Sequence, residues 1–137
     1  MIIERKKPTP TNRQIELMDM NELIQSIKQH PDFDRVGMIL CHNGIVRATS
    51  REGSKVTGLK LTVDHEKLRQ VIEKHKKRPG ILDIRIQIVE NKRLAVGDDV
   101  MFLVVAGDIR DNVVPALHDT LNEIKTTVTR KEQFFAD

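Results

Sequence analysis

The spacing of apolar residues along the chain predicts three helices. The first covers residues 19–30, the second runs from an N-cap at Asp64 to about residue 77, and the third runs from an N-cap at Asp111 to about residue 126. In each segment, apolar side chains recur every three or four positions, as the buried face of a helix requires. The expected buried residues are Leu23, Ile24 and Ile27 in the first helix, Leu68, Val71, Ile72 and His75 in the second, and Val114, Leu117, Leu121 and Ile124 in the third.

Between these helices the pattern changes to one that predicts β-strands. Residues 36–49 are apolar on both faces, which predicts a central strand, and residues 100–106 have the same character. Residues 56–63 and 82–88 alternate apolar and polar side chains, and the second of these segments is typical of a half-exposed strand. A short final strand is expected at residues 129–135. This order predicts an α+β fold, with a mixed or antiparallel sheet and helices packed on one of its faces.

The length of 137 residues is enough for one domain with its own core, so we expect a single domain over residues 1–137. Residues 1–18 begin with a short apolar pair and continue as a basic, proline-containing stretch, which indicates a loose arm or an edge strand. The N-terminus has no apolar stretch typical of a signal peptide, and no window resembles a membrane span. The single cysteine, Cys41, cannot form an internal disulfide. We therefore expect a cytoplasmic protein with no membrane partner.

Charge and aromatic content narrow the kinds of partner. The chain has 23 basic and 20 acidic residues, a net charge of +3 that suits a small anionic ligand or an acidic partner better than nucleic acid. It contains no Trp, no Tyr and four Phe, so side chains on which bases could stack are scarce. We expect no nucleic-acid partner.

Sequence signatures of common enzyme classes and metal sites are missing. The chain has no GxSxG motif, no glycine-rich phosphate loop, no HExxH motif and no paired-cysteine motif. The histidines are scattered, without a second ligand at helical spacing, so we expect no metal site and no cofactor. The five histidines are His30, His42, His65, His75 and His118.

The single cysteine, a basic run and a polar loop are each explained by their expected structural surroundings. Cys41 lies in an apolar strand and is expected in the core, because a reactive thiolate needs an electropositive, partly open setting. The basic run at residues 74–78 is expected to be a solvated helix end, where cations complement the helix dipole. The polar loop at residues 51–55 leaves two alternatives open, closure over an anion or a plain hairpin loop.

A set of cations at the ends of predicted strands and helices is the main candidate for a functional site. Side chains at such ends are where sheet proteins build sites, and several cations that meet there would suit a phosphate. Crowded cations also disfavour one another's protonation, which would yield a neutral lysine able to act as a nucleophile or general base. The set consists of Arg47, Arg110, Lys125, Arg130 and Lys131.

The same segments resemble those of molybdopterin synthase large (catalytic) subunits. The motifs occur in the family's order over residues 36–133. Gly-Ile-Val-Arg at 44–47 resembles the family's Gly-x-Val-Arg, and Leu-Ala-Val-Gly-Asp-Asp at 94–99 resembles its Leu-x-x-Gly-Asp-Glu. Arg110 matches the arginine that opens the family's final helix. Ile-Lys-Thr at 124–126 resembles its Leu-Lys-Thr, and Arg-Lys-Glu at 130–132 resembles its Trp-Lys-Arg-Glu.

The resemblance implies an α/β hammerhead fold and a homodimer flanked by two small ubiquitin-like sulfur-carrier subunits, together a heterotetramer. In that family the carrier's Gly-Gly thiocarboxylate tail enters a pocket of the large subunit, and two sulfurs pass to cyclic pyranopterin monophosphate, a pterin phosphate, to form the dithiolene of molybdopterin. By position, Lys125 and Lys131 would be the active lysines. Arg47 and Arg110 would hold the substrate phosphate, one of them from the neighbouring subunit, and Arg130 is grouped with these substrate-binding residues.

The chain also departs from the family pattern at positions that bear on catalysis. Ile109 precedes Arg110 where the family has His-Arg, and residues 89–90 (Val-Glu) replace a second His-Arg pair. Lys131 lies one residue closer to Lys125 than expected, and an alternative alignment puts Arg130 in its place. A second functional interpretation therefore stands beside the first, a catalytically inactive relative that serves as a dimeric anion-binding, pterin-binding or interaction module.

Overall fold

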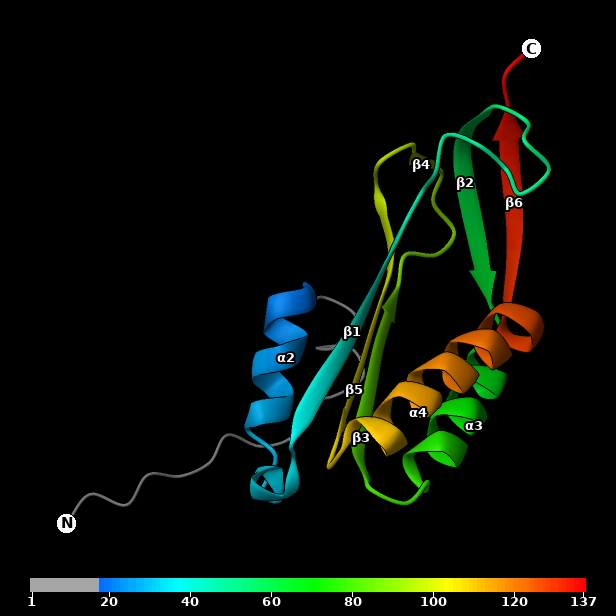
Figure 1. The fold of residues 1–137 in the computed structure, drawn as a ribbon. Coiled ribbons are helices and arrows are strands. Elements are labelled where there is room, and N and C mark those ends of the chain that lie inside the picture. The colour runs from blue at the N-terminus through cyan, green and yellow to red at the C-terminus, as the bar shows by residue number, and fades with distance from the viewer. Residues whose placement is uncertain (1–17) are drawn as a thin grey trace.

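A computed structural model describes residues 18–137, so the prediction of an N-terminal arm lies almost entirely outside the described residues. The sequence-predicted helices and strands are present, and the α+β prediction is confirmed (Figure 1). In chain order, the elements are α2 (Met20–Lys28), the 3-10 turn η1 (Phe33–Arg35), β1 (Met38–Ile45), β2 (Val56–Val63), α3 (His65–Lys76), β3 (Ile81–Ile88), β4 (Leu94–Ala95), β5 (Asp99–Gly107), α4 (Arg110–Glu123), the π-helix η2 (Ile124–Val128) and β6 (Thr129–Phe135).

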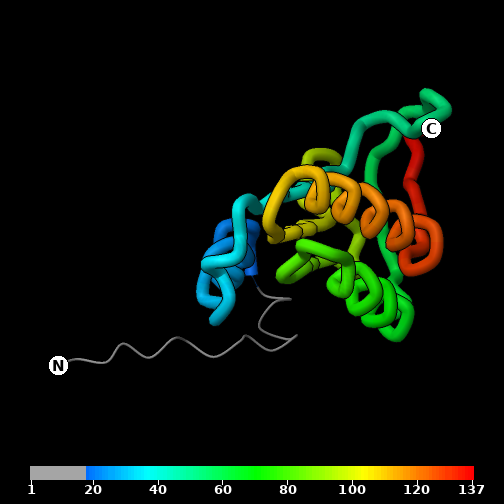
Figure 2. Tube along the Cα trace, turned by 60° about the horizontal axis from the view of Figure 1, so that its bottom comes forward, coloured from blue at the N-terminus to red at the C-terminus, as the bar shows by residue number. Residues whose placement is uncertain are grey.

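The strands form two antiparallel sheets of three strands each. The first has the order β1-β5-β3, and the second has the order β4-β2-β6. Figure 2 shows β6 beside β2, with α4 leading through η2 into β6. The predicted final strand at residues 129–135 is therefore confirmed as β6. The second sheet matters for the site because it places a C-terminal strand close to the end of the longest helix.

Helices cover both faces of the first sheet. Successive side chains of β5 point to opposite faces, so alternate residues of this strand pack against different helices. Leu103 and Val105 are fully buried in one cluster with Val113 of α4. Val104 belongs to a separate cluster with Leu23 of α2 on the opposite face. The prediction of helices on one face only is therefore wrong: α2 covers one face and α3 with α4 covers the other (Figure 1).

Strand β1 lies at an edge of its sheet, so the prediction that it is central is wrong. It is apolar on both faces because Leu40 packs against the α4 side while Ile39 packs against the α2 side. Cys41, predicted in the core, is exposed. Partial burial nevertheless raises the pKa of the Cys41 thiol, which keeps it protonated.

The polar face of β3 is buried, so the prediction of a half-exposed strand is wrong. Asp83 and Arg85 are 5% and 4% exposed and form an ion pair, with Arg85 Nε 2.8 Å from Asp83 Oδ2. Arg85 Nη1 also donates to Ser26 Oγ of α2, and Lys76 Nζ lies 3.3 Å from Asp83 Oδ1. The alternating charged residues of β3 are buried and paired with each other. Sequence periodicity alone does not distinguish buried, paired charges from exposed ones.

The first two helices begin as predicted. The Asp19 carboxylate accepts from the backbone N–H of Glu22 in a capping box, and the Asp64 carboxylate accepts from the backbone N–H of Lys67. Among residues 18–137, no helix combines the length and the apolar character needed to cross a membrane.

The third helix begins two residues earlier than predicted, at Arg110, and Asp111 is not its N-cap. Asp108 provides the hydrogen bonds instead, because its Oδ1 accepts from the backbone N–H of Ile109 and from Asn112 Nδ2. The buried face also differs, since the predicted Val114 is 48% exposed. The buried residues of the α4 and η2 segments are Val113, Ala116, Thr120, Ile124 and Val128.

Candidate functional site

A cavity of about 740 Å³ opens where the end of β1, the start of β5, the second sheet and η2 meet. Within residues 18–137, four basic side chains line it, and no Asp or Glu does. None of these four cations forms an ion pair with another residue of the described part of the chain. Unpaired cations around a hollow without carboxylates favour an anionic ligand. The charged and neighbouring polar lining residues are Arg47, Arg51, Lys125, Lys131, His42, Ser50 and Asn122.

Lys125 reaches this cavity from the π-helix η2, two residues after the last residue of α4. Two threonine hydroxyls form hydrogen bonds to backbone carbonyls in this wide turn. Thr127 Oγ1 donates to the Glu123 carbonyl at 2.7 Å, and Thr126 Oγ1 donates to the Asn122 carbonyl at 2.9 Å. Short π-helical turns often occur at functional sites, because they change the direction of side chains within a helix. Here the turn lets Ile124 and Val128 stay buried while Lys125 faces the cavity.

The surroundings of Lys125 lower its pKa below the ordinary value for a lysine. Partial burial is the main cause, and the positive charges of Arg51 and Lys131 add to it. Both causes disfavour the ammonium form. The sequence prediction that crowded cations act on one lysine's protonation agrees in direction with this result, although burial is the larger effect.

The structure separates Lys131 from its neighbour Arg130. Lys131 lines the cavity together with Thr129 and Gln133, which lie on the same face of β6. Arg130 lies between them in a strand whose side chains alternate, so it belongs to the opposite face, and it does not line the cavity. Of the two alignments left open by the sequence, the one with Lys131 places a lysine in the cavity.

Arg47 and Arg51 come from the segment that connects β1 and β2. Arg47 Nε donates to the Thr49 carbonyl at 2.8 Å, which holds the guanidinium at the cavity wall. The turn that carries Arg51 is closed by the bond from Ser54 N–H to Ser50 Oγ at 3.1 Å. An antiparallel bridge between Thr49 and Lys55 closes the loop as in a hairpin, although β1 and β2 belong to different sheets. Closure of this loop over an anion stays a prediction.

Arg110 does not meet the other cations within one chain. It lies at the first residue of α4, whereas Lys125 follows the last one, and fifteen residues at 1.5 Å per residue put them about 20 Å apart. Two apolar side chains near Arg110 are unusually exposed, Ile109 at 54% and Val114 at 48%. The set predicted from sequence is thus divided into Arg47, Lys125 and Lys131 in the cavity, with Arg110 and Arg130 outside it.

Sequence reasoning overlooked His42, which lines the cavity from β1. Burial lowers the pKa of His42, and the positive charge of Lys125 lowers it further, so the imidazole is neutral at neutral pH. The only available signal was the alternation of β1, which puts residue 42 on the same face as Leu40. The sequence places Arg51 in a polar loop but does not group it with the other cations.

The chemistry of the cavity does not suit a resident metal. Across residues 18–137, His, Cys, Asp and Glu side chains do not gather in groups of three or more that could hold a metal ion. The lining residues donate hydrogen bonds and carry positive charge, which suits phosphate or carboxylate groups.

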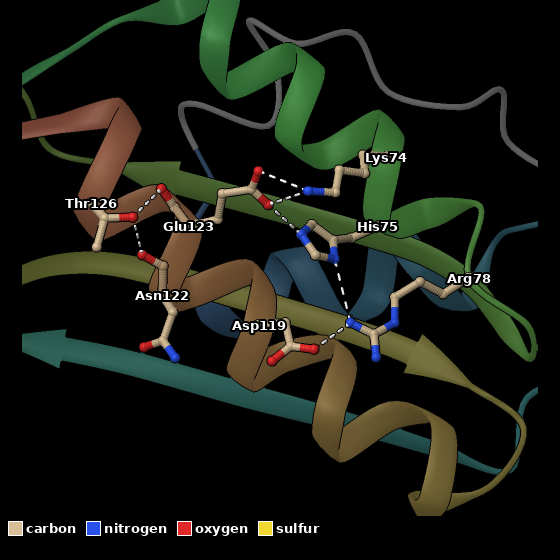
Figure 3. A pocket seen from close by; sticks show the side chains of 7 residues that line it. All are labelled: Lys74, His75, Arg78, Asp119, Asn122, Glu123 and Thr126. Atoms are coloured by element: carbon tan, nitrogen blue, oxygen red, sulfur yellow. Dashed lines mark hydrogen bonds and ion pairs between the residues drawn. The ribbon is translucent and has the colours of Figure 1, made fainter.

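A second, shallower hollow lies between α3 and α4, and its charges are already paired (Figure 3). Glu123 of α4 points between two residues of α3, with Oε2 2.7 Å from His75 Nε2 and Oε1 3.0 Å from Lys74 Nζ. Arg78 Nη1 lies 2.8 Å from Asp119 Oδ2. The prediction of a solvated basic run at 74–78 is therefore wrong for His75, which is 5% exposed, whereas the Lys74 side chain is 65% exposed. This network fixes the end of α4 immediately before η2.

We expect Glu123→Gln to be about 1 kcal/mol less stable than the wild type at pH 7, with the difference disappearing in acid. Hydrogen bonds from His75 and Lys74 hold the pKa of Glu123 below its ordinary value. The carboxylate therefore stabilises the fold above the pKa of the unfolded chain, about 4.3, and this contribution is lost as pH falls through the lower pKa of the folded protein. Urea unfolding at pH 7 and pH 3 measures the difference. Glu52→Gln is the control, and an equal loss at both pH values would contradict the prediction.

Comparison with known proteins identifies a family for this chain. A sequence model described as MoaE protein matches residues 12–127. A search of curated proteins gives no significant match.

Solved structures share the fold at low sequence identity. "The X-ray Crystal Structure of Molybdopterin Synthase from Staphylococcus aureus" has 22% identity and a TM-score of 0.64, covering 76% of this chain and 78% of that one. "Molybdopterin cofactor biosynthesis protein E from Burkholderia multivorans ATCC 17616" has 21% identity and a TM-score of 0.68, covering 87% and 85%. A "Protein-protein complex of subunit 1 and 2 of Molybdopterin-converting factor from Helicobacter pylori 26695" has 17% identity and a TM-score of 0.64, covering 88% and 85%.

Proposed function

Because the chain belongs to the MoaE protein family, we propose that it is the catalytic subunit of a molybdopterin synthase. In this reaction, sulfur passes from a thiocarboxylated carrier protein to cyclic pyranopterin monophosphate and forms the molybdopterin dithiolene. The observation that carries the proposal is the cavity itself, with Lys125, Lys131, Arg47 and Arg51 around it and no carboxylate on its walls. Both reactants are anions, so one cationic cavity can receive the carrier tail and the pterin phosphate.

Each cation has a distinct role in this proposal. Lys125 lies beside the carbonyl of the carrier's last residue, where a positive group or a neutral amine assists attack on a thioester-like carbon. Lys131 is the second active lysine, on the strand opposite. Arg47 and Arg51 hold the pterin phosphate, and the bond from Arg47 to the Thr49 carbonyl supports a fixed position for it. Arg130 is given no role, since it lies outside the cavity.

Arg110 completes the site only if a second protomer supplies it. Arg110 does not line the cavity of its own chain, and its backbone lies about 20 Å from that of Lys125 along the helix. The exposed Ile109 and Val114 next to Arg110 support a subunit contact there, because single large apolar side chains grouped at a helix start are suited to burial in an interface. We therefore propose a homodimer in which Arg110 of each protomer reaches the cavity of the other.

A small sulfur-carrier subunit with a C-terminal Gly-Gly tail is the proposed partner. The related Helicobacter pylori structure is described as a complex of subunits 1 and 2 of molybdopterin-converting factor, which supports a two-subunit assembly. The mouth of the cavity includes Ile45, which is 55% exposed, and the nearby Val96 is 43% exposed. An apolar rim of this kind supports docking of a folded partner around the cavity, which admits the tail. A cytoplasmic location stays a prediction.

The test is reconstitution of the reaction from purified parts. The chain is mixed with a thiocarboxylated carrier and cyclic pyranopterin monophosphate, and the dithiolene pterin is measured after oxidation to a fluorescent derivative. We expect product in proportion to thiocarboxylate consumed. Binding of the carrier without product would favour the second candidate, an inactive relative that binds anions or pterins as a dimer. That alternative rests on Ile109 and on residues 89–90, since Glu90 pairs with His65 at 2.8 Å and does not line the cavity.

A further inference from the structure

The imidazole of His42 lies in the cavity without a partner of its own. It makes no side-chain hydrogen bond or ion pair with another of residues 18–137, whereas His65, His75 and His118 each lie beside a carboxylate. Its ring extends along β1 over Gly44: a Cβ built on Gly44 would lie 3.4 Å from His42 Nε2. Because Gly44 also lines the cavity, this places Nε2 at the cavity wall.

Among residues 18–137, the charged groups that line the cavity with His42 are all cations. They are Lys125 from η2, Lys131 from β6, and Arg47 and Arg51 from the connection between β1 and β2. The neighbouring residues of β2 and β5 in the cavity are apolar: Leu59, Leu61, Val100 and Met101. Burial and the charge of Lys125 lower the pKa of His42, which favours its neutral form. The cavity also lowers the pKa of Lys125, but an ordinary lysine has a far higher pKa than an ordinary histidine, so the imidazole is the group more readily available as a base.

Resting on the proposed function, we propose that His42 is the general base that releases sulfur from the carrier. Once the sulfur is bonded to the pterin, a thioester joins it to the carrier's C-terminal carbonyl carbon. Water attacks that carbon, so that a C–O bond forms while His42 accepts the water's proton. The C–S bond then breaks, and its electron pair stays on sulfur as the pterin thiolate. The carrier leaves as a carboxylic acid that loses its proton to solvent, and His42 also returns its proton to solvent.

This assignment gives Lys125 and His42 complementary tasks. The Lys125 ammonium stabilises the negative charge that develops on the carbonyl oxygen and then on sulfur. His42 supplies the basicity that an ammonium lacks.

The test uses the full chain with the thiocarboxylated carrier and cyclic pyranopterin monophosphate, under single turnover and across pH 5–8. His42→Phe keeps an aromatic ring of similar size and removes the titrating nitrogen, and His42→Ala leaves room for free imidazole. We expect the wild-type rate to rise with pH through a midpoint below that of an ordinary histidine. His42→Phe should react about a hundredfold more slowly and lack this limb. Added imidazole should accelerate His42→Ala and leave His42→Phe unchanged, which a purely structural role would not produce.

The outcomes separate this inference from the proposed function. An active wild type with a His42→Phe variant that keeps both the rate and the acid limb would overturn the role of His42 alone. A wild type that consumes no thiocarboxylate would overturn the proposed function and the role of His42 together. The geometry has a separate check by NMR: the pKa of His42 should rise in Lys125→Met, and an unchanged value would refute the pairing of the two groups.

Discussion

Replacing Lys125 by alanine should lower the rate of sulfur transfer at least about a hundredfold and leave the protein folded. The side chain lines the cavity in which the proposed reaction takes place. It makes no hydrogen bond or ion pair with another described residue, and the buried residues of η2 are its neighbours Ile124 and Val128. Single-turnover formation of the dithiolene pterin measures the rate, and circular dichroism and thermal unfolding measure the fold.

Two comparisons make the Lys125 result interpretable. Lys125→Met keeps the aliphatic part of the side chain and removes the charge, so it should be as slow as alanine if the charge matters. Lys77→Ala removes a lysine at the C-cap of α3, outside the cavity, and should react at the wild-type rate. A Lys125→Ala variant that turns over normally would show that its assigned role is wrong.

The second large effect should distinguish two adjacent residues of β6. We expect Lys131→Ala to slow the reaction about tenfold to a hundredfold, and Arg130→Ala to change it less than about twofold. The reason is the alternation of the strand, which places Lys131 in the cavity and Arg130 on the opposite face. The same single-turnover assay compares the two variants, and each alanine removes one positive charge from the same strand.

The reverse outcome has a definite meaning. If Arg130→Ala were the slow variant and Lys131→Ala the normal one, the alternative alignment would hold, and the second active group would be an arginine. Salt dependence provides an internal check, since both variants lose one charge and should weaken long-range attraction of an anion similarly. A difference in rate that persists at high salt therefore reports direct contact in the cavity.

Local patterns predicted two of the three helix starts and the positions of the strands, because caps and side-chain periodicity depend on neighbouring residues. Asp64 caps its helix as expected, and the final strand forms where its pattern indicated, whereas Asp111 does not cap α4. The errors concern tertiary surroundings. An edge strand covered by helices on both faces has the composition of a central strand, as β1 does, and the paired charges Asp83 and Arg85 have the pattern of an exposed face.

The site was predictable in part for the same reason. Arg47, Lys125 and Lys131 carry motif positions, and the fold brings all three to one cavity. His42 has no motif, and only the direction of its strand relative to η2 makes it a neighbour of Lys125. Arg51 depends on a turn closed by Ser50 and Ser54, which sequence composition identifies as a loop but does not orient.

The absence of acidic residues from the cavity walls links ligand binding to folding. Four like charges held together repel one another in the empty protein, so an anion that binds there should raise the melting temperature by mass action. The repulsion among these cations therefore lowers the stability of the unliganded protein, as is common at functional sites. Scarcity of pterin substrate in a cell would then leave a larger share of these molecules vulnerable to proteolysis, so that supply of the substrate also governs the abundance of the protein.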